Sequence, residues 1–362
     1  MFSFFKKHDY AATIEPGNTC VVVRHGGKLL DAALAAGLDW PHDCRVGSCG
    51  TCRCVLKSGR IKPLTDFAYT LAPEELRAGV ILACQTQLRS DVTIEITLAA
   101  STSATDTVRG TIESLHKLTH DILEVRIKLA EPAFASAQAG QYADLQIAGL
   151  DAPRSYSFLR APRIEADGQV TFCIRRVPGG AFTEWLFGAD RQAALLTLSG
   201  PYGGFRYHAA TGRMICVAGG SGIAPVYAIL LDVAAANIVR DCVVLFGART
   251  TADLYYLDEL AALRARWRGN FELIPVLSME PSDSAWRGAR GLVADALAGC
   301  VPQGSFTADD QGYLCGPPAM VDAGIAAMHR LGMARDAIYC DRFLDASTQP
   351  GGRDALAGQP PL

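Results

Sequence analysis

The sequence predicts three successive domains: a small α+β domain, an antiparallel β-barrel and an α/β domain with a parallel sheet. Three patterns predict them. Residues 1–100 hold a dense cysteine loop among short strand patterns, residues 101–208 hold short β-rich runs between turns, and residues 209–346 alternate strand and helix patterns. A chain of 362 residues is also longer than one hydrophobic core usually serves. We expect residues 347–362, rich in Gly, Pro and Ala, to be disordered.

The composition excludes several classes of protein. A net charge of −3 argues against nucleic acid as the main partner. The 12 Cys are scattered through a long chain whose start lacks signal-peptide architecture, so we expect a reducing, cytoplasmic compartment. The longest uncharged run, residues 214–231, is broken by Gly219, Gly220 and Pro225, which indicates a strand, a turn and a helix instead of a membrane span.

The first domain begins with a stretch that looks disordered. A β-branched run at 19–24 then predicts a strand, and residues 28–37 predict a helix that stops at a Gly. Further strands are predicted at 53–57 and 92–98. A strand, a helix, a cysteine loop and closing strands fit a small β-grasp domain.

Four cysteines of this domain have the spacing of a metal centre. Cys44, Cys49 and Cys52 follow the C-x4-C-x2-C pattern, and Cys84 supplies a remote fourth thiolate. This is the ligand pattern of a plant-type [2Fe-2S] cluster. The alternatives are a zinc site or a set of buried thiols. Zinc usually takes two closely spaced pairs of ligands, so the dense triplet favours the cluster.

The residues between these cysteines suit the same interpretation. Gly47 and Gly50 have no Cβ and let the backbone turn in toward the sulfurs. Cys54 breaks the spacing, and we interpret it as a neighbour that packs beside the loop.

The barrel is predicted to follow a linker at residues 99–106. Its expected strands are 109–115, 121–129, 142–147, 155–159 and 169–176.

Two motifs of this domain are candidate binding sites. Arg154, Ser155, Tyr156 and Ser157 lie on one predicted strand, and Gly179 and Gly180 precede a predicted short helix that contains Thr183. A cationic fork, an aromatic face and hydroxyls can hold a phosphate and flank a flat ring such as a flavin. Two Gly before a helix can form an anion site. A solvated arginine and a plain turn are the more common interpretations of each signal alone.

The third domain has the clearest alternation of elements. Strands are predicted at 214–218, 242–247, 271–277 and 312–315, and helices at 224–235, 255–265, 291–298 and 317–331.

The first strand and helix of this domain enclose a Gly-rich turn that contains Gly220, Ser221 and Gly222. This context suits a phosphate-binding turn, so we favour a nucleotide over a structural turn. The motif departs from the usual dinucleotide fingerprint, because Pro225 replaces the third Gly and the second strand ends without an acidic residue. Cys315, beside Gly316, closes a later strand; its thiol either contacts a reacting ring or is a small buried hydrophobe.

The order of these motifs resembles the family in which a ferredoxin is fused to a ferredoxin-NADP⁺ reductase and feeds electrons to bacterial oxygenases. The likeness covers nearly the whole chain. It is carried by residues 41–52, 154–158, 177–180, 185–188, 216–220, 246–249, 271–278, 315–318 and 341–343.

The resemblance implies FAD as the flavin, with roles for individual residues. Arg154 would hold the FAD pyrophosphate, and Gly180 and Thr183 would complete that site. Tyr156 would lie along the flavin, and Ser157 would hydrogen-bond near its reactive nitrogen.

The resemblance also implies a nicotinamide dinucleotide site. Gly220, Ser221 and Gly222 would cradle the dinucleotide, although Ser221 stands where the family often has Thr. Cys315 would lie near the nicotinamide and Phe343 near the flavin ring. No cluster of basic and hydroxyl residues that would bind the 2′-phosphate of NADPH is evident, which favours NADH as the reductant. NADPH stays an alternative, because Arg249 at the end of the second strand is a cation that could bind this phosphate.

The implied function is an electron relay. NADH would deliver a hydride to FAD, and single electrons would pass through [2Fe-2S] to a separate oxygenase of aromatic or alkyl-aromatic hydrocarbons that docks near residues 41–54. The oxygenase must be separate, because the seven His form no Cys-x-His pair of a Rieske centre and no evident iron triad. A membrane-bound partner would bring the chain to the inner face of the membrane. The alternatives are a same-cofactor reductase for a non-oxygenase acceptor, of the sugar-deoxygenation type, and an iron-sulfur redox sensor.

Overall fold

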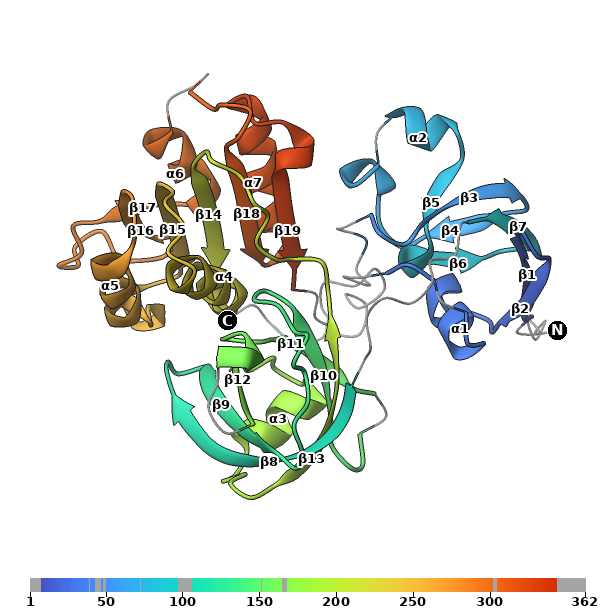
Figure 1. Cartoon of the computed structure of the whole chain (residues 1–362), viewed down its shortest axis with the longest axis horizontal. Coiled ribbons are helices and arrows are strands. Elements are labelled where there is room, and N and C mark those ends of the chain that lie inside the picture. The colour runs from blue at the N-terminus through green and yellow to red at the C-terminus, as the bar shows by residue number, and fades with distance from the viewer. Residues whose placement is uncertain are drawn as a thin grey trace. The chain divides into compact units, whose positions relative to one another are not determined.

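A computed structural model of the protein describes residues 8–38, 40–42, 47, 50–71, 73–96, 106–150, 152–164, 168–301 and 305–343. The described residues form two compact units, one ending at Ile96 and one running from Asp106 to Phe343 (Figure 1). Each unit has its own hydrophobic core. The expected disordered tail, and the expected linker apart from Asp106, lie outside the described residues.

The first unit is built on a mixed sheet with the strand order β2-β1-β7-β3-β5. Strand β1 pairs antiparallel with β2 and parallel with β7, and helix α1 buries Leu29, Leu30 and Ala33 in the core of this sheet. This arrangement confirms the β-grasp prediction. The elements are β1 Tyr10–Glu15, β2 Thr19–Val23, α1 Leu29–Ala35, β3 Arg53–Ser58, β4 Ile61–Pro63, α2 Pro73–Arg77, β5 Val80–Leu82, β6 Thr86–Leu88 and β7 Val92–Glu95.

Strand β1 corrects the expectation of a disordered start. It is an interior strand between β2 and β7, and Ala12 and Ile14 are buried in the core. Its alternation is hard to see in the sequence, because Ala12 carries little hydrophobic signal. The hairpin to β2 turns through Gly17 and Asn18, both at positive φ, a conformation for which Gly and Asn pay the smallest steric cost.

The second unit begins with an antiparallel sheet in the order β11-β10-β13-β8-β9-β12. A bridge between Phe158 and Phe172 joins the two ends of this order and nearly closes the sheet into the predicted barrel. Strand β13 was absent from the prediction, since it is poor in β-branched residues and contains Gly200-Pro201. The elements are β8 Asp106–Lys117, β9 Ile122–Leu129, β10 Tyr142–Gln146, β11 Arg154–Ser157, β12 Gln169–Arg175, α3 Ala181–Phe187 and β13 Leu195–Tyr202.

A parallel sheet in the order β17-β16-β15-β14-β18-β19 follows, as predicted, with two additional edge strands, β17 and β19. From β14, the chain adds β15, β16 and β17 on one side of this strand and then β18 and β19 on its other side. Open α/β sheets bind ligands outside the carboxyl ends of the strands at such a switch point. The elements are β14 Met214–Gly219, α4 Ile223–Ala235, β15 Cys242–Ala248, α5 Leu257–Arg266, β16 Phe271–Leu277, β17 Ala289–Arg290, α6 Val293–Cys300, β18 Gln311–Gly316, α7 Pro318–Arg330 and β19 Ile338–Arg342.

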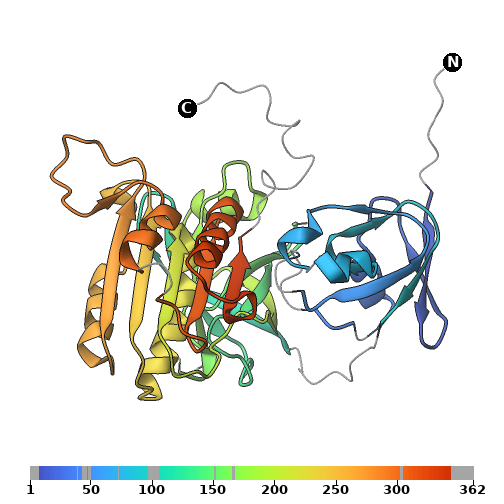
Figure 2. The same cartoon turned by 90° about the horizontal axis from the view of Figure 1, so that it is seen from above.

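Helices cover both faces of this sheet (Figure 2). Alternate residues of a strand point to opposite faces, so Cys216 packs with α4 and α5, while Val217 packs with α6 and α7. Short 3-10 turns lie between the main elements of the chain: η1 Phe67–Tyr69, η2 Ala83–Gln85, η3 Pro162–Ile164, η4 Gly220–Gly222, η5 Thr251–Asp253 and η6 Arg335–Ala337. Among the described residues, no helix has both the length and the apolar character that crossing a membrane requires.

The barrel and the parallel sheet share one core within the second unit. Leu159 and Cys173 of the barrel pack in the same cluster as Ala224 and Tyr227 of α4. Strand β12 also lies beside the η4 turn. The packing therefore brings the edge of the barrel to the switch point of the sheet.

A buried ion pair ties together the starts of β14 and β18. The Asp310 carboxylate, 1% exposed, accepts hydrogen bonds from the Arg213 Nη2 and backbone N–H at 2.7 and 2.6 Å, and from the Thr307 N–H at 3.0 Å. Burial by itself raises the pKa of this carboxyl, but the hydrogen bonds from Arg213 and Thr307 lower it overall. A lowered pKa in the folded state stabilises the fold above the unfolded-state pKa of about 3.9, and this stability is lost as the pH falls through the folded value.

We expect Asp310→Asn to lower the free energy of unfolding at pH 7 by about 2–3 kcal/mol, because charged hydrogen bonds to Arg213 are lost. The variant should also lose less stability than the wild type when the pH is lowered through the titration of Asp310. Urea unfolding of the second unit at several pH values measures both effects. Asp309→Asn changes an exposed neighbour and should stay within about 0.5 kcal/mol of the wild type; equal losses in the two variants would contradict the prediction.

Candidate functional site

Two of the four predicted cluster ligands can be placed, and they lie together. Cys52 directly precedes β3, and Cys84 lies in η2 directly after β5. Strands β3 and β5 pair with each other, and the Ala83 N–H donates to the Cys52 carbonyl at 3.2 Å. Both thiols are buried, at 2% and 1% exposed. The remaining predicted ligands, Cys44 and Cys49, lie outside the described residues.

Two glycines of the cysteine loop, Gly47 and Gly50, have positive φ values, which favour glycine. Gly47 has φ +81°, and a Cβ there would lie 2.8 Å from the Gln85 Cγ. Gly50 has φ +74°, and its carbonyl accepts a hydrogen bond from the Arg53 Nε at 2.9 Å. Side chains cannot be added at either position without a shift, so this loop end packs closely against η2 and β3.

Cys54 differs from the predicted ligands. It is 4% exposed, and its Sγ lies 3.9 Å from the Ile81 carbonyl oxygen. Burial, followed by the neighbouring Cys52, raises the pKa of the Cys54 thiol well above its ordinary value. A neutral thiol turned toward the backbone agrees with the interpretation of Cys54 as a packing neighbour.

The candidate flavin residues lie on β11, at one end of the barrel sheet. Arg154 is exposed, and its Nη1 donates to the Ala152 and Pro153 carbonyls at 3.0 Å each. The Ser155 hydroxyl donates to Asp144 at 2.6 Å, whereas Ser157 is buried. The four residues therefore present a cation, a hydroxyl and an aromatic side chain along one short edge.

The aromatic side chain of this edge is held by packing. The Tyr156 ring lies 5.4 Å, centroid to centroid, from the Phe182 ring of α3. Burial raises the pKa of the Tyr156 phenol, so the side chain is neutral at physiological pH. A neutral, fixed ring is suited to lie against a flat ligand.

The loop before α3 is shaped by Thr183. Its hydroxyl accepts from the Val177 N–H at 3.0 Å and contacts the Val177 and Gly180 carbonyls at 3.0 and 3.1 Å. Gly179 has φ +72°, and a Cβ on Gly180 would lie 2.9 Å from the Thr183 Oγ1. The hydroxyl of Thr183 thus organises the loop, and its direct contact with a pyrophosphate stays a prediction.

The Gly-rich turn of the parallel sheet packs backbone against backbone on the end of β18. Gly220 has φ +53°, and a Cβ on Gly222 would lie 2.2 Å from the Cys315 carbonyl oxygen. Gly316 has φ +144° and faces the Gly219 backbone in the same way. Ser221, between the two glycines of η4, is partly buried. This close approach places the N-terminus of α4 at the switch point, and the N-terminus of a helix favours anions.

Cys315 and Phe343 both lie near the end of β18, beside this turn. Cys315 is fully buried, and burial raises the pKa of its thiol well above the ordinary value, so the thiol is neutral. The Phe343 N–H donates to the Gly316 carbonyl at 2.9 Å, and the Phe343 ring packs against the core that contains Cys315. The structure thus brings together four residues that the sequence predicted separately: Gly222, Cys315, Gly316 and Phe343.

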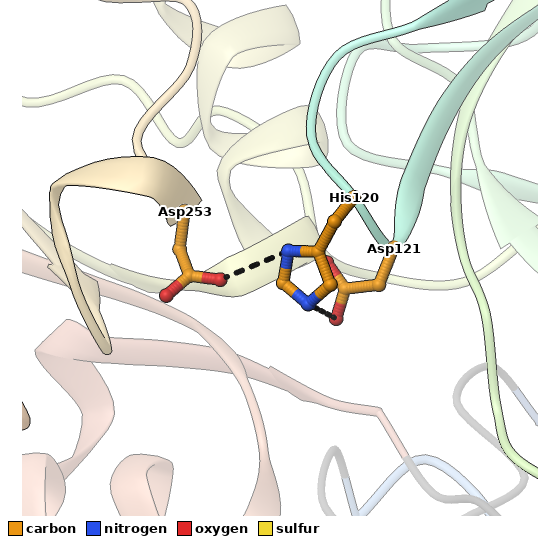
Figure 3. Close-up of side chains that lie close together, drawn as sticks. All are labelled: His120, Asp121 and Asp253. Atoms are coloured by element: carbon orange, nitrogen blue, oxygen red, sulfur yellow. Dashed lines mark ion pairs between the residues drawn. The ribbon is translucent and has the colours of Figure 1, made fainter.

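Arg249 is engaged in an ion-pair cluster. Its Nη2 donates to Asp121 at 3.1 Å and to Asp253 at 3.0 Å. His120 lies between the two carboxylates (Figure 3). Asp121 also pairs with Arg175 at 3.2 Å. The two carboxylates and the imidazole of His120 lie close enough together to hold a metal ion. Because the two guanidinium groups already balance the two carboxylates, we interpret the cluster as an ion-pair network.

The sequence reasoning missed Asp121 as a partner of Arg249. The two residues are 128 positions apart, and no motif joins them. Their pairing means that Arg249 is not an uncommitted cation that would attract a 2′-phosphate.

Comparisons with known proteins identify the domains of this chain. The 2Fe-2S iron-sulfur cluster binding domain matches residues 12–89, the oxidoreductase FAD-binding domain matches residues 109–207 and the oxidoreductase NAD-binding domain matches residues 216–324. The chain is 42% identical over 352 residues to the xylene/toluene monooxygenase electron transfer component of Pseudomonas putida. The aligned region covers 95% of this chain and 98% of that protein. The chain belongs to the ferredoxin-reductase fusion family of oxygenase reductases.

Other members of the family resemble this reductase over a similar length. The reductase subunit of an aromatic O-demethylase from Amycolatopsis is 34% identical, over 92% of this chain and 99% of that one. The crystal structure of an Amycolatopsis cytochrome P450 reductase superposes with a TM-score of 0.69 at 32% identity, over 92% and 98% of the two chains. The ferredoxin reductase of carbazole 1,9a-dioxygenase gives a TM-score of 0.67 at 27% identity, over 94% and 100%.

The reductase is therefore an NADH-dependent oxidoreductase with FAD and a [2Fe-2S] cluster. Its residues fit these cofactors. The paired, buried Cys52 and Cys84 suit an iron-sulfur cluster, and the backbone turn that a Cβ on Gly222 would disrupt suits a dinucleotide pyrophosphate. The exposed guanidinium of Arg154 and the packed ring of Tyr156 have the chemistry that suits a pyrophosphate and a flat ring, as in FAD.

Proposed function

We propose that this reductase supplies electrons from NADH to a separate oxygenase that hydroxylates aromatic or alkyl-aromatic hydrocarbons. The full-length similarity to the xylene/toluene monooxygenase electron transfer component carries this proposal. Relatives at 32% identity include the reductase components of phenol and propane monooxygenases. An oxygenase is thus the common acceptor among these relatives, and the higher identity favours alkyl-aromatic substrates.

The protein's own contribution is placement. Bound nicotinamide, flavin and cluster supply the redox chemistry, and the chain holds them in order. In this proposal η4 and the start of α4 bind the dinucleotide, and Cys315 and Phe343 lie beside its reacting end. Arg154, Ser155, Tyr156, Ser157, Gly179 and Gly180 form the FAD edge, and Cys44, Cys49, Cys52 and Cys84 hold the cluster.

NADH is the proposed reductant in place of NADPH. Arg249, the one cation that the sequence offered for a 2′-phosphate, is paired with Asp121 and Asp253. A guanidinium that already has two carboxylate partners gains little from a third anion. This pairing supports selectivity for NADH.

The oxygenase is proposed to dock near the cysteine loop, residues 41–54, because electrons leave through the cluster. We also propose that the chain works in the cytoplasm, where NADH is available and thiolate ligands stay reduced. A membrane-bound oxygenase would place this docking at the inner face of the membrane.

Reconstitution tests the proposed function. The purified reductase, with NADH, should support hydroxylation of xylene or toluene when an alkyl-aromatic monooxygenase is added. Product formation should require the reductase, the oxygenase and NADH together. Turnover only with a sugar-deoxygenation partner would favour the non-oxygenase reductase, and failure to reduce an artificial dye with NADH would contradict any reductase.

Arg154→Ala tests the FAD edge. The variant loses the only cation of the β11 motif, so we expect FAD affinity to fall by about ten- to one-hundred-fold, as for loss of a charged hydrogen bond. The ratio of bound FAD to iron after gel filtration measures this loss of affinity. Arg109→Ala removes an exposed cation from β8 of the same barrel and should keep all its flavin; equal flavin in both variants would show that the FAD edge lies elsewhere.

A further inference from the structure

Tyr255 reaches from one loop of the parallel sheet to another. It lies between η5 and α5, after the second strand of the sheet, and is 6% exposed. Its hydroxyl donates to the Gly220 carbonyl at 3.0 Å, across 35 positions of the sequence. Gly220 is the first residue of η4, the turn proposed to bind the dinucleotide.

The Gly220 carbonyl oxygen has two hydrogen-bond donors inside the protein, of which the Tyr255 hydroxyl is one. It also accepts a hydrogen bond from the Ile223 N–H at the start of α4. A carbonyl oxygen has two lone pairs, and both are now directed to donors inside the protein. The oxygen is therefore held on the inner side of the turn.

The orientation of that carbonyl decides where the next N–H points. A trans peptide is planar, and its C=O and N–H bonds point in opposite directions. When the Gly220 oxygen is held inward, the Ser221 N–H points outward. An anion at a helix N-terminus needs N–H groups toward it and carbonyl oxygens away from it. The Tyr255 hydroxyl thus favours the one orientation of this peptide that suits a pyrophosphate.

Tyr255 is itself rigidly held. Its ring packs edge-on against Phe246 of β15, at 5.7 Å between centroids and 85° between ring planes. Burial raises the pKa of the Tyr255 phenol well above its ordinary value, so the hydroxyl remains a donor across the physiological pH range. A fixed, protonated phenol is able to hold the turn without a ligand present.

The neighbouring Tyr256 points to different partners. It has φ +58° and ψ 19°, a left-handed conformation that costs a non-Gly residue about 1–2 kcal/mol. Its hydroxyl donates to the Glu124 carboxylate of β9 and lies 3.6 Å from the Cys173 Sγ of β12. The two consecutive tyrosines therefore contact different parts of the unit. The Tyr255 hydroxyl bonds to the Gly-rich turn, and the Tyr256 hydroxyl bonds to the barrel.

We propose that Tyr255 is a positioning residue of the nucleotide site, whose hydroxyl presets the Gly220–Ser221 peptide so that the Ser221 N–H faces the dinucleotide pyrophosphate. This inference rests on the proposed dinucleotide site at Gly220, Ser221 and Gly222. It adds a residue that acts through the backbone of the turn and that no sequence motif indicates.

Tyr255→Phe tests the role by removing the hydroxyl alone. The Kd for ADP-ribose, which has the pyrophosphate but no nicotinamide, should rise about five- to ten-fold, the loss of one hydrogen bond. The KM for NADH should rise in parallel, while kcat at saturating NADH stays within about two-fold. Titration calorimetry and steady-state dye reduction on the full-length holoprotein give these values, with FAD and iron content as checks on folding.

Tyr256→Phe is the matched control, since it removes the same group from the adjacent residue. It should lower stability but leave the Kd for ADP-ribose within about two-fold of the wild type. A wild-type Kd in the Tyr255 variant, or an equal rise in both variants, would overturn the positioning role. If the wild type itself binds no ADP-ribose, the proposed dinucleotide site is also contradicted. A failure of the site is thereby distinguished from a failure of the Tyr255 role alone.

Discussion

Replacing Cys84 by Ala is expected to abolish the iron-sulfur cluster and to leave reduction of the flavin by NADH intact. Ala supplies no thiolate, and a [2Fe-2S] cluster of this type needs four. We expect reduction of cytochrome c, a one-electron protein acceptor, to fall at least about 100-fold, because loss of a ligand exceeds the 10–100-fold effects of outer-shell changes. Iron and sulfide analysis, and the paramagnetic resonance signal of the NADH-reduced protein, measure the cluster directly.

Cys54→Ala is the control for this prediction. Cys54 is also buried, and it lies two positions from Cys52, but its thiol is directed to the Ile81 carbonyl. Its removal should leave iron content and cytochrome c reduction close to the wild type. A Cys84 variant with full iron, or a Cys54 variant without it, would show that the fourth ligand is misassigned. Retained FAD in both variants would exclude global misfolding as the cause.

Replacing Gly222 by Ala is expected to disable the proposed nucleotide site. The added Cβ would lie 2.2 Å from the Cys315 carbonyl oxygen and 2.5 Å from its carbon, and backbone atoms of a central strand cannot rotate away as a side chain does. The Gly-rich turn must therefore move away from β18. A displacement of about 1 Å at a reacting site costs about 100-fold in rate, so we expect flavin reduction by NADH to slow by that factor.

The Gly222 prediction is measured by stopped-flow flavin reduction. Dithionite should still reduce the flavin and the cluster of the variant, since neither site is altered. Gly299→Ala provides the control, because at this exposed position in α6 the added Cβ would meet no atom within 4 Å beyond its chain neighbours and its own helix backbone. It should react with NADH normally and gain about 0.5–1 kcal/mol of stability from the better helix former. Normal NADH kinetics in the Gly222 variant would mean that the turn does not carry the dinucleotide.

Most of the parallel sheet could be predicted from the sequence, whereas its edges could not. Strand β14, the Gly-rich turn and helix α4 have a long apolar run, clear punctuation and high burial, so local pattern and tertiary environment agree. Strand β17 has two residues, and β19 is only partly buried. Such edge strands carry little hydrophobic signal and exist because a neighbouring strand offers hydrogen bonds.

The candidate sites divide in the same way. Cys44, Cys49, Cys52 and Cys84 could be proposed as ligands from their spacing, since one family of clusters imposes that spacing. The glycines of the turns could be proposed from their place between a strand and a helix. By contrast, the partner of Arg249 and the hydroxyl that holds Gly220 lie 128 and 35 positions away in the sequence. The identity of Asp121 or Tyr255 carries no sign of these contacts.

The sequence by itself determined the three kinds of domain and the iron-sulfur ligand pattern, because local periodicity, turn chemistry and ligand spacing can be recognised along the chain. The resemblance of its motifs to the family implied FAD and NADH. The tertiary structure alone decided that Arg249 is neutralised by Asp121 and that Tyr255 holds the Gly220 carbonyl inward. It also decided that Thr183 supports its own loop. The physical reason is that hydrogen bonds and ion pairs depend on distance in space, and only the packed strands and helices set which distant side chains meet.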